Sequence, residues 1–310
     1  MSASGYDIIG DIHGHANDLL RLLNHLGYKN KHGYFEHPER KVVFLGDFID
    51  RGINQKQVLD IVIPMVKERS ALAIMGNHEF NALAFHTKDP LNPDAWLRKR
   101  TDKNIHQHLA FLNDYAGPKQ ADALAEVLAF FYALPLWIDL EEFRAIHASW
   151  HPTSLEYIKP QLSPAHQLDT HLLAQASKPH SPAFDAIENL LKGVDVRLPN
   201  ELFFFDKDGT KRRHMRIKWW LNKANTLADL AIGRFDKQLH QIPAPPDIIV
   251  GYPEDAKPVF VGHYWMSGQP KPLKHNVACL DYSVAKNGKL VAYRWEGEST
   301  IDETHFVYVA

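Results

Sequence analysis

The chain has 310 residues, of which 45% are hydrophobic, so it can bury one large core or two modest ones. Its 35 basic and 37 acidic residues leave a formal net charge of -2, which argues against a general affinity for nucleic acid or for an anionic membrane. Cys279 is the only cysteine, so an intramolecular disulfide is excluded, and no apolar run approaches the length of a membrane span. Because the first residues lack an apolar leader pattern, we expect a cytoplasmic protein.

The first 75 residues alternate between short apolar runs and helical patterns. The runs 6–9, 41–45 and 71–75 are typical of buried strands. Between them lie two amphipathic helical patterns, one ending at Gly27 and one, around 58–66, that Pro64 is expected to bend. This order predicts an α/β sheet whose strands end at a common edge. Ligands of open α/β sheets bind beyond that edge.

The rest of the chain is less regular, and we expect all of residues 1–310 to form a single domain with two insertions. The first insertion, at about 86–133, is predicted to be helical, and a strand pair at 136–140 and 143–146 follows it. The second, at about 152–246, contains a hairpin candidate turning at Asp208-Gly209 and a basic aromatic run that alternates like a half-solvated strand over 211–220. Five further strands are predicted at 248–250, 258–261, 277–280, 290–295 and 306–309.

Glycine-rich polar motifs follow the strand-type runs. They read Gly-Asp-Ile-His-Gly at 10–14, Gly-Asp-Phe-Ile-Asp-Arg-Gly at 46–52, Gly-Asn-His-Glu at 76–79 and Gly-His at 262–263. Carboxylate, amide and imidazole groups at strand ends can hold divalent metal ions. The mixture suits manganese, iron, zinc or nickel better than calcium, and it lacks the thiolates of a structural zinc site.

These motifs and two late histidines provide ligands for a pair of ions. We expect Asp11 and His13 to hold one ion, and Asp47 to reach both ions with its two oxygens. The second ion would take its remaining ligands from Asn77, His147 and His263. Two ions about 3.5–4 Å apart bridge a hydroxide and clamp phosphoryl oxygens, so the pattern predicts phosphate-ester hydrolysis.

Three more polar residues have the properties that such a reaction needs. Arg51 can hold two nonbridging phosphate oxygens with its guanidinium fork. His78 can protonate the leaving alkoxide, and Asp50 can orient His78 and raise its pKa. We therefore expect Asp50, Arg51 and His78 to be the catalytic residues, and manganese to be the metal.

In order and spacing, the first three motifs resemble those of calcineurin-like metallophosphoesterases. The Asp-Arg-Gly ending and the Glu after Asn-His are most similar to the phosphoprotein phosphatase branch, which includes serine/threonine phosphatases and the bacteriophage lambda phosphatase. The resemblance covers residues 6–80 and returns around His147 and over 259–282. It implies a four-layer αββα sandwich with two mainly helical or irregular insertions, a dinuclear metal centre and the roles given above.

The chain departs from the family pattern at two points. Family members carry glycine soon after the third ligand region, whereas His147 is followed here by Ala148-Ser149. Phosphatases of this type also use a second phosphate-binding arginine from between the two late histidines. The candidates for it are Arg197, Arg213 and Arg216, and the sequence does not choose among them.

Two functions are compatible with these residues. The leading hypothesis is a serine/threonine-type protein phosphatase that hydrolyses phosphomonoesters by attack of a metal-bridging hydroxide. The alternative is a dinucleoside polyphosphate hydrolase, such as a diadenosine tetraphosphatase, or a nucleotide phosphodiesterase. Both take a phosphorylated substrate and neither requires nucleic acid or a membrane. A non-catalytic scaffold is disfavoured because no metal position is exchanged. Five other histidines are expected to be surface or structural residues: His86, His106, His108, His151 and His214.

Overall fold

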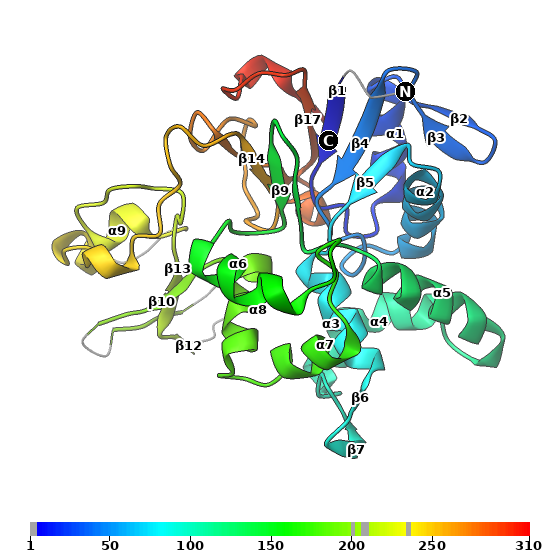
Figure 1. Ribbon diagram of the computed structural model, residues 1–310, viewed down its shortest axis with the longest axis horizontal. Coiled ribbons are helices and arrows are strands. Elements are labelled where there is room, and N and C mark those ends of the chain that lie inside the picture. Colours follow the sequence, from blue (N-terminus) through cyan, green and yellow to red (C-terminus); the bar gives the residue numbers. More distant parts are fainter. Residues whose placement is uncertain (1–4, 200–201, 206–210, 234–236) are drawn as a thin grey trace.

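The computed structural model describes residues 5–199, 202–205, 211–233 and 237–310, and these residues form two packed β-sheets with helices outside them (Figure 1). In the larger sheet the strand order is β16-β17-β1-β4-β5, and β18 pairs with β17. Its strands are β1 Gly5–Ile9, β4 Arg40–Phe44, β5 Ala71–Ala73, β16 Asp281–Tyr282, β17 Lys289–Trp295 and β18 Phe306–Val309. Strands β1, β4 and β5 are parallel, as the strand–helix alternation predicts.

The second sheet has the strand order β15-β14-β9-β8. Its strands are β8 Trp137–Asp139, β9 Arg144–Ile146, β14 Val259–Val261 and β15 Val277–Cys279. The last three run parallel to one another, whereas β8 is antiparallel to β9. The predicted strand pair around 136–146 is therefore confirmed, and it belongs to a different sheet from β1.

The two faces of each strand bury side chains in different layers. Ile8 and Val43 lie in a cluster with Phe143 and Phe260 of the second sheet, and this cluster fills the space between the sheets. Ile9, the next residue along β1, lies in the larger cluster that includes the outer helices. Successive residues of β1 and β4 thus face opposite layers. The αββα order expected from the sequence is the order observed.

Helices α1 Ala16–His25 and α2 Gln55–Lys67 are the crossover helices of the parallel strands. Leu19, Leu22 and Leu23 are fully buried on one face of α1, because their spacing brings them to the same side of a helix. Helix α2 continues past Pro64 to Lys67. Two short strands between these helices, β2 Lys29–Lys31 and β3 Tyr34–Glu36, form a hairpin.

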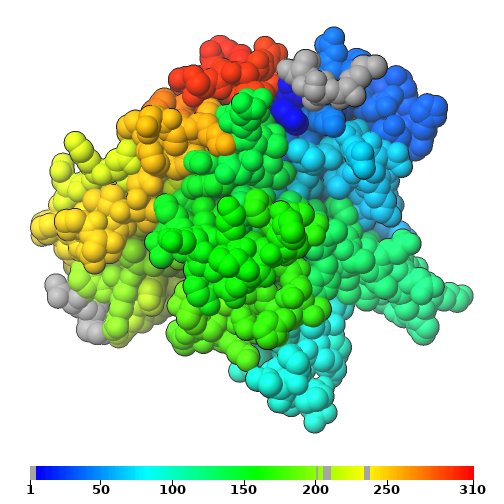
Figure 2. Space-filling model, in the orientation of Figure 1, coloured from blue at the N-terminus to red at the C-terminus, as the bar shows by residue number. Residues whose placement is uncertain are grey.

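The first insertion follows α3 Asn77–His86 and contains a hairpin as well as helices. Its elements are β6 Lys88–Asp89, β7 Asn92–Trp96, α4 Asp102–Asp114, a 3-10 turn at Pro118–Gln120 and α5 Ala121–Tyr132. The β6–β7 hairpin projects at the bottom of the molecule in the space-filling view (Figure 2). The first insertion is thus mainly helical, as predicted, apart from a hairpin at its start, where the β6–β7 turn and Pro93 interrupt the helical pattern.

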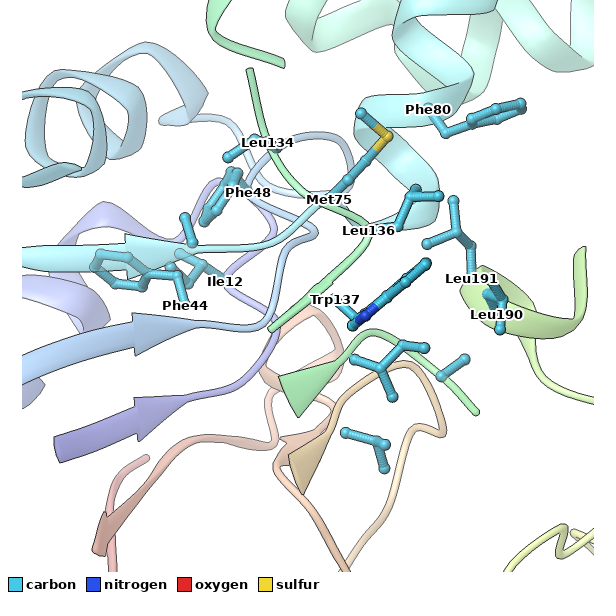
Figure 3. Packing of buried hydrophobic residues seen from close by; sticks show 14 of the residues in the cluster. Ile12, Phe44, Phe48, Met75, Phe80, Leu134, Leu136, Trp137, Leu190 and Leu191 are labelled. Carbon is cyan, nitrogen blue, oxygen red and sulfur yellow. The ribbon is translucent and has the colours of Figure 1, made fainter. Parts of the chain in front are cut away.

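The second insertion begins with helices that the sequence pattern did not predict. They are α6 Pro152–Ile158, a 3-10 turn at Lys159–Gln161, α7 Thr170–Ala176 and α8 Pro182–Lys192. Side chains of α8 pack close to the second sheet: Figure 3 shows Leu190 and Leu191 beside Leu136 and Trp137. The serine before α8, Ser181, caps the helix by accepting a hydrogen bond from the backbone N–H of Phe184.

Short strands and turns complete this insertion. They are β10 Asp195–Arg197, β11 Phe204–Phe205, β12 Lys211–Arg212, β13 His214–Arg216, α9 Leu227–Leu230 and 3-10 turns at Lys237–Gln241 and Pro246–Ile248. The predicted alternation holds from Met215 to Trp219, whose odd-numbered side chains are buried, but Arg213 is exposed. The strand predicted at 248–250 is wrong, because Pro245 and Pro246 fix their φ angles and lack N–H donors, and a 3-10 turn forms. The turn at Asp208-Gly209 lies outside the described residues.

The chain ends with two further 3-10 turns, at Val284–Lys286 and Glu303–His305, on either side of β17. The strands predicted around 258–261, 277–280, 290–295 and 306–309 are confirmed. Within the described parts of the chain, none of the helices combines the length and the apolar character needed to cross a bilayer.

Candidate metal centre

The six predicted metal ligands follow the carboxyl ends of five strands from both sheets. Asp11 and His13 come after β1, and Asp47 after β4; Asn77 opens α3, which follows β5. His147 comes directly after β9, and the last ligand, His263, lies two residues beyond β14. Because parallel strands end at a shared edge, residues 252 positions apart in the chain meet there.

One carboxylate oxygen, Oδ2 of Asp47, is the point on which the histidines converge. It lies 3.6 Å from Nε2 of His13, 3.4 Å from Nε2 of His147 and 3.9 Å from Nε2 of His78. The other oxygen, Oδ1, accepts a hydrogen bond from the backbone N–H of His78 at 2.9 Å. In this structure Oδ2 of Asp47 faces both halves of the site.

Backbone carbonyls fix the orientation of two of the histidine rings. Nδ1 of His147 donates to the carbonyl of Leu45 at 2.7 Å, and Nδ1 of His13 donates to that of Ile49 at 3.0 Å. These bonds leave Nε2 of each ring facing Asp47, as the ring nitrogen that could bind a metal ion. Metal-binding histidines are held in this way by a partner for their second nitrogen.

Asn77 lies on the side of Asp47 where the late histidines meet. Its Oδ1 is 2.7 Å from Nδ1 of His263 and 3.1 Å from Nε2 of His147. Ligand atoms of Asp47, His147 and His263 all lie within 4.8 Å of one another, and so do those of His13, Asp47 and His78. Hard oxygen and imidazole donors gathered this closely suit divalent ions such as manganese, iron or zinc, so the residues fit the metal pair that the sequence predicts.

Asp11 is positioned by the loop after β14. Its two oxygens accept hydrogen bonds from the backbone N–H of His263 at 3.2 and 3.1 Å, and Oδ2 is 3.9 Å from Nε2 of His13. A Cβ atom at Gly262 would lie 2.0 Å from Oδ1 of Asp11, so only glycine permits this approach. Burial and the neighbouring carboxylate of Asp281 raise the pKa of Asp11. A bound cation would offset both effects.

Electrostatics in the site are dominated by the buried Asp47. Burial acts to lower the pKa of His147, but the carboxylates of Asp47 and Asp11 raise it to about 10. For His13 the carboxylate of Asp47 does not offset the effect of burial, which lowers the pKa of His13 to about 4. His147 thus behaves as a cation beside Asp47 and His13 as a neutral ring. A metal ion would replace the proton on His147 as the partner of Asp47.

The loops that carry the ligands have strained backbones. His13, Asp47 and His263 have φ angles of 46°, 50° and 70°, which non-glycine residues rarely adopt. Glu79 holds two of these loops together: its carboxylate accepts hydrogen bonds from the backbone N–H groups of Asp47, Phe48 and Gly76, at 2.8, 2.8 and 3.0 Å. In the sequence Glu79 was notable only as a family marker. The structure gives it the role of fixing one ligand loop against the next.

Asp50 and His78 form the pair that the sequence predicts, and a third residue joins them. His78 Nδ1 is 2.5 Å from one carboxylate oxygen of Asp50, and His108 Nδ1 is 2.7 Å from the other. Burial acts to raise the pKa of Asp50, but hydrogen bonds from the two histidines lower it. Burial acts to lower the pKa of His78, but the charges of Asp47 and Asp50 raise it. His108, expected to be a surface or structural residue, is therefore buried in the site.

The predicted arginines lie at different distances from the candidate ligands. Arg51 is exposed at the edge of the site, with its guanidinium carbon 5.2 Å from the ring centroid of Trp265. Of the three candidates for a second arginine, Arg216 is the one that reaches a predicted ligand: Nη1 lies 3.1 Å from Nε2 of His263, and Asp195 binds the same guanidinium at 2.6 and 3.1 Å. Arg197 and Arg213 are exposed.

Contacts with α8 hold the segment after His147, where this chain has Ala148-Ser149 and the family pattern has glycine. The backbone N–H groups of both residues donate to the carbonyl of Leu190, at 3.0 and 3.3 Å. The carbonyl of Ala148 in turn accepts hydrogen bonds from the indole of Trp219 and the hydroxyl of Tyr264. The segment after His147 is thus held by the second insertion and not by glycine conformations.

Comparison with known proteins agrees with this architecture. A protein serine/threonine phosphatase from Saccharomyces cerevisiae superposes over 98% of this chain and 78% of its own, with a TM-score of 0.52 at 14% sequence identity. A mutant cold-active protein tyrosine phosphatase superposes over 97% and 81%, with a TM-score of 0.50 at 20% identity. At such identities the likeness is one of fold.

Sequence relatives match part of this chain. The asymmetrical bis(5'-nucleosyl)-tetraphosphatase PrpE of Halalkalibacterium halodurans is 43% identical over 74 residues, which are 24% of this chain and 30% of that protein. PrpE of Geobacillus sp. is 30% identical over 143 residues, 46% of this chain and 55% of that protein. The matches thus span 30% and 55% of the length of these two relatives. The family model for calcineurin-like phosphoesterases matches residues 6–198, and the chain accordingly belongs to the calcineurin-like phosphoesterase family.

Proposed function

We propose that this protein is a metal-dependent phosphoric ester hydrolase whose two divalent ions are held by Asp11, His13, Asp47, Asn77, His147 and His263. The observation that carries the proposal is the convergence of histidines from both sheets on Oδ2 of Asp47. When bound, such an ion pair supplies Lewis acidity toward the phosphoryl oxygens and a water of lowered pKa. Manganese is the first ion to test.

The protein's own residues supply the remaining chemistry. His78 Nε2 faces the metal centre because Nδ1 is held by Asp50. Burial opposes a proton on His78, but the carboxylates of Asp47 and Asp50 raise its pKa, which favours the protonated ring that can donate to the leaving oxygen. Arg51, at the exposed edge, can neutralise a nonbridging phosphate oxygen.

For the substrate we propose a dinucleoside polyphosphate. Relatives that are 30–43% identical to parts of this chain carry the name of an asymmetrical bis(5'-nucleosyl)-tetraphosphatase. The phosphoprotein phosphatase hypothesis depends on the Asp-Arg-Gly and Asn-His-Glu motifs alone. A phosphopeptide is therefore the comparison substrate.

Initial rates of the manganese-loaded protein test this function. The substrates are diadenosine tetraphosphate, a phosphoserine peptide, a cyclic nucleotide and p-nitrophenyl phosphate. His78→Asn and Asp47→Asn should each lose activity on all hydrolysed substrates, and the exposed His106→Asn serves as the control. A specificity constant highest for the dinucleotide supports the substrate. A preference for the phosphopeptide restores the phosphatase hypothesis, and no turnover on any of the four contradicts the proposed function.

A further inference from the structure

A cavity of about 350 Å³ adjoins the metal centre on the side of His78. Asn77, His78 and Asp50 line one wall, and residues of the first and second insertions line the others. Its volume is at the lower end of the range of ligand pockets, about 300–1,000 Å³. The cavity therefore offers room for a small group bound next to the reacting phosphate.

Basic side chains dominate the lining. Arg51, Arg98, Lys192 and Arg212 contribute to it, whereas Asp50 is the acidic residue of the lining and is already bound by two histidines. Lys192 also forms an ion pair with Glu188, so part of its charge is compensated. The net charge of the cavity is positive. Such a lining favours an anion, and most of all one with several charges.

Arg98 is the cation whose surroundings most clearly lack an acidic partner. The guanidinium Nη2 donates to the amide oxygens of Asn104 and Gln107, both at 3.2 Å, and among the described residues no carboxylate lies within ion-pair distance of it. Burial lowers the pKa of Arg98, although the more distant carboxylates of Asp50 and Glu188 partly oppose this. Amide oxygens orient a guanidinium without neutralising it, so its charge remains available to a ligand.

We propose that Arg98 is the centre of a second phosphate-binding subsite, which holds a further phosphate group of a polyphosphate chain while the reacting phosphate lies at the metal ligands. This inference rests on the proposed function and specifies its substrate as one with linked phosphates. Arg212 lines both this cavity and a neighbouring groove of about 970 Å³, so the rest of a large substrate can continue there.

The test compares ligands with one and two phosphonate groups. Binding of methylphosphonate and of methylenediphosphonate, which is not hydrolysed, is measured by calorimetry on the metal-loaded protein in excess magnesium. Arg98→Gln should weaken methylenediphosphonate binding about tenfold and methylphosphonate binding less than threefold. Arg98→Lys, which keeps the charge, should retain most of the preference. Arg100→Gln is the matched control, because Arg100 stacks on Trp96 outside the cavity lining.

Kinetics provide the second readout. In Arg98→Gln the KM for diadenosine tetraphosphate should rise about tenfold with little change in kcat, while the kinetics on p-nitrophenyl phosphate stay unchanged. Equal losses for one-group and two-group ligands, or no change in either, would overturn the subsite. If the protein hydrolyses no phosphate compound but Arg98→Gln still selectively loses methylenediphosphonate, the subsite stands and the proposed function fails.

Discussion

His108 binds the carboxylate of Asp50 on the opposite side from His78: Nδ1 of His108 lies 2.7 Å from Oδ1, and Nδ1 of His78 lies 2.5 Å from Oδ2. His108 belongs to α4, in the first insertion, and its ring stacks on Phe111 at 4.6 Å. The first insertion thereby fixes the orientation of the Asp50 carboxylate. Asp50 in turn fixes the orientation of the His78 ring, which faces the metal ligands. We infer that His108 is a positioning residue for the proposed general acid.

Replacing His108 by phenylalanine should test this chain of contacts. The Phe ring preserves the stacking on Phe111 but removes the hydrogen bond to Asp50, which costs about 1–3 kcal/mol where the partner is buried and charged. We expect kcat to fall about tenfold on an alkyl phosphate and much less on p-nitrophenyl phosphate, whose leaving group needs little protonation.

His108→Asn, which retains a donor near Nδ1, should recover part of the rate, and metal content should not change. The exposed His106→Asn is the control. An equal loss on both substrates, with a lowered melting temperature, would mean that His108 only supports the fold.

Gly262→Ala should disrupt the metal centre without changing any ligand. The new Cβ would lie 2.0 Å from Oδ1 of Asp11, so this carboxylate must move from its present position. A displacement of about 1 Å at a reacting centre lowers rates about 100-fold. We expect that loss of activity together with reduced metal content, measured by elemental analysis.

Gly268→Ala is the matched control, because no atom lies within 4 Å of a Cβ there, although its φ of 87° strains the new residue. Full metal loading in Gly262→Ala would contradict the assignment of Asp11 as a ligand.

Adding manganese to the chelator-treated protein should raise its melting temperature. A ligand that binds the folded state alone stabilises it by about 2.7 kcal/mol at a concentration of 100 times its Kd. The buried carboxylates of Asp281 and Asp47 repel that of Asp11, and a bound cation relieves this repulsion. Calorimetry with and without the metal measures the shift.

Asp47→Asn should remove most of this shift, since its Oδ2 faces both halves of the site. Asp60→Asn, an exposed change of the same kind on α2, should keep it. A shift that survives in Asp47→Asn would place the metal elsewhere.

The sequence predicted that the candidate ligands come together, because these residues follow strands directly. Asp11, Asp47 and Asn77 follow three parallel strands in chain order. Because the carboxyl ends of parallel strands lie at the same edge of a sheet, the strand pattern alone predicts that these residues are close together. His108 could not be found in the same way. It lies 58 residues from Asp50, on a helix whose apolar pattern gives its packing and not the direction of a polar ring.

Backbone strain is the other property that could not be predicted from the sequence. The glycines in the motifs predict tight turns, but the residues with φ angles of 46° and 50° are His13 and Asp47 themselves. Nothing in the composition of a motif tells which residue adopts the left-handed conformation. The hairpin at β6–β7 and the 3-10 turn at Pro246–Ile248 were missed for a related reason, since local turn geometry outweighs a short apolar pattern there.

His86 should make the stability of the protein depend on pH. Burial, with help from the nearby His108 and Arg100, lowers the pKa of His86 to about 4 from its usual 6.5. Between pH 6.5 and 4 the unfolded chain therefore takes up a proton at this residue that the folded chain does not. The free energy of unfolding falls with falling pH over that window and is unaffected above it. Because the ring is partly exposed, we expect its contribution to be about 1–2 kcal/mol.

Urea denaturation of the wild-type protein and His86→Phe at pH 7 and pH 5 measures this contribution. The Phe ring can pack against Phe85 and Phe111, whose centroids lie 5.4 and 6.0 Å from that of His86. The variant should lose less stability than the wild type on going from pH 7 to pH 5, whereas His106→Phe, an exposed change on α4, should lose as much as the wild type. Equal losses in His86→Phe and the wild type would show that His86 does not titrate below its usual pKa, because only a residue with different pKa values in the folded and unfolded states contributes to the slope.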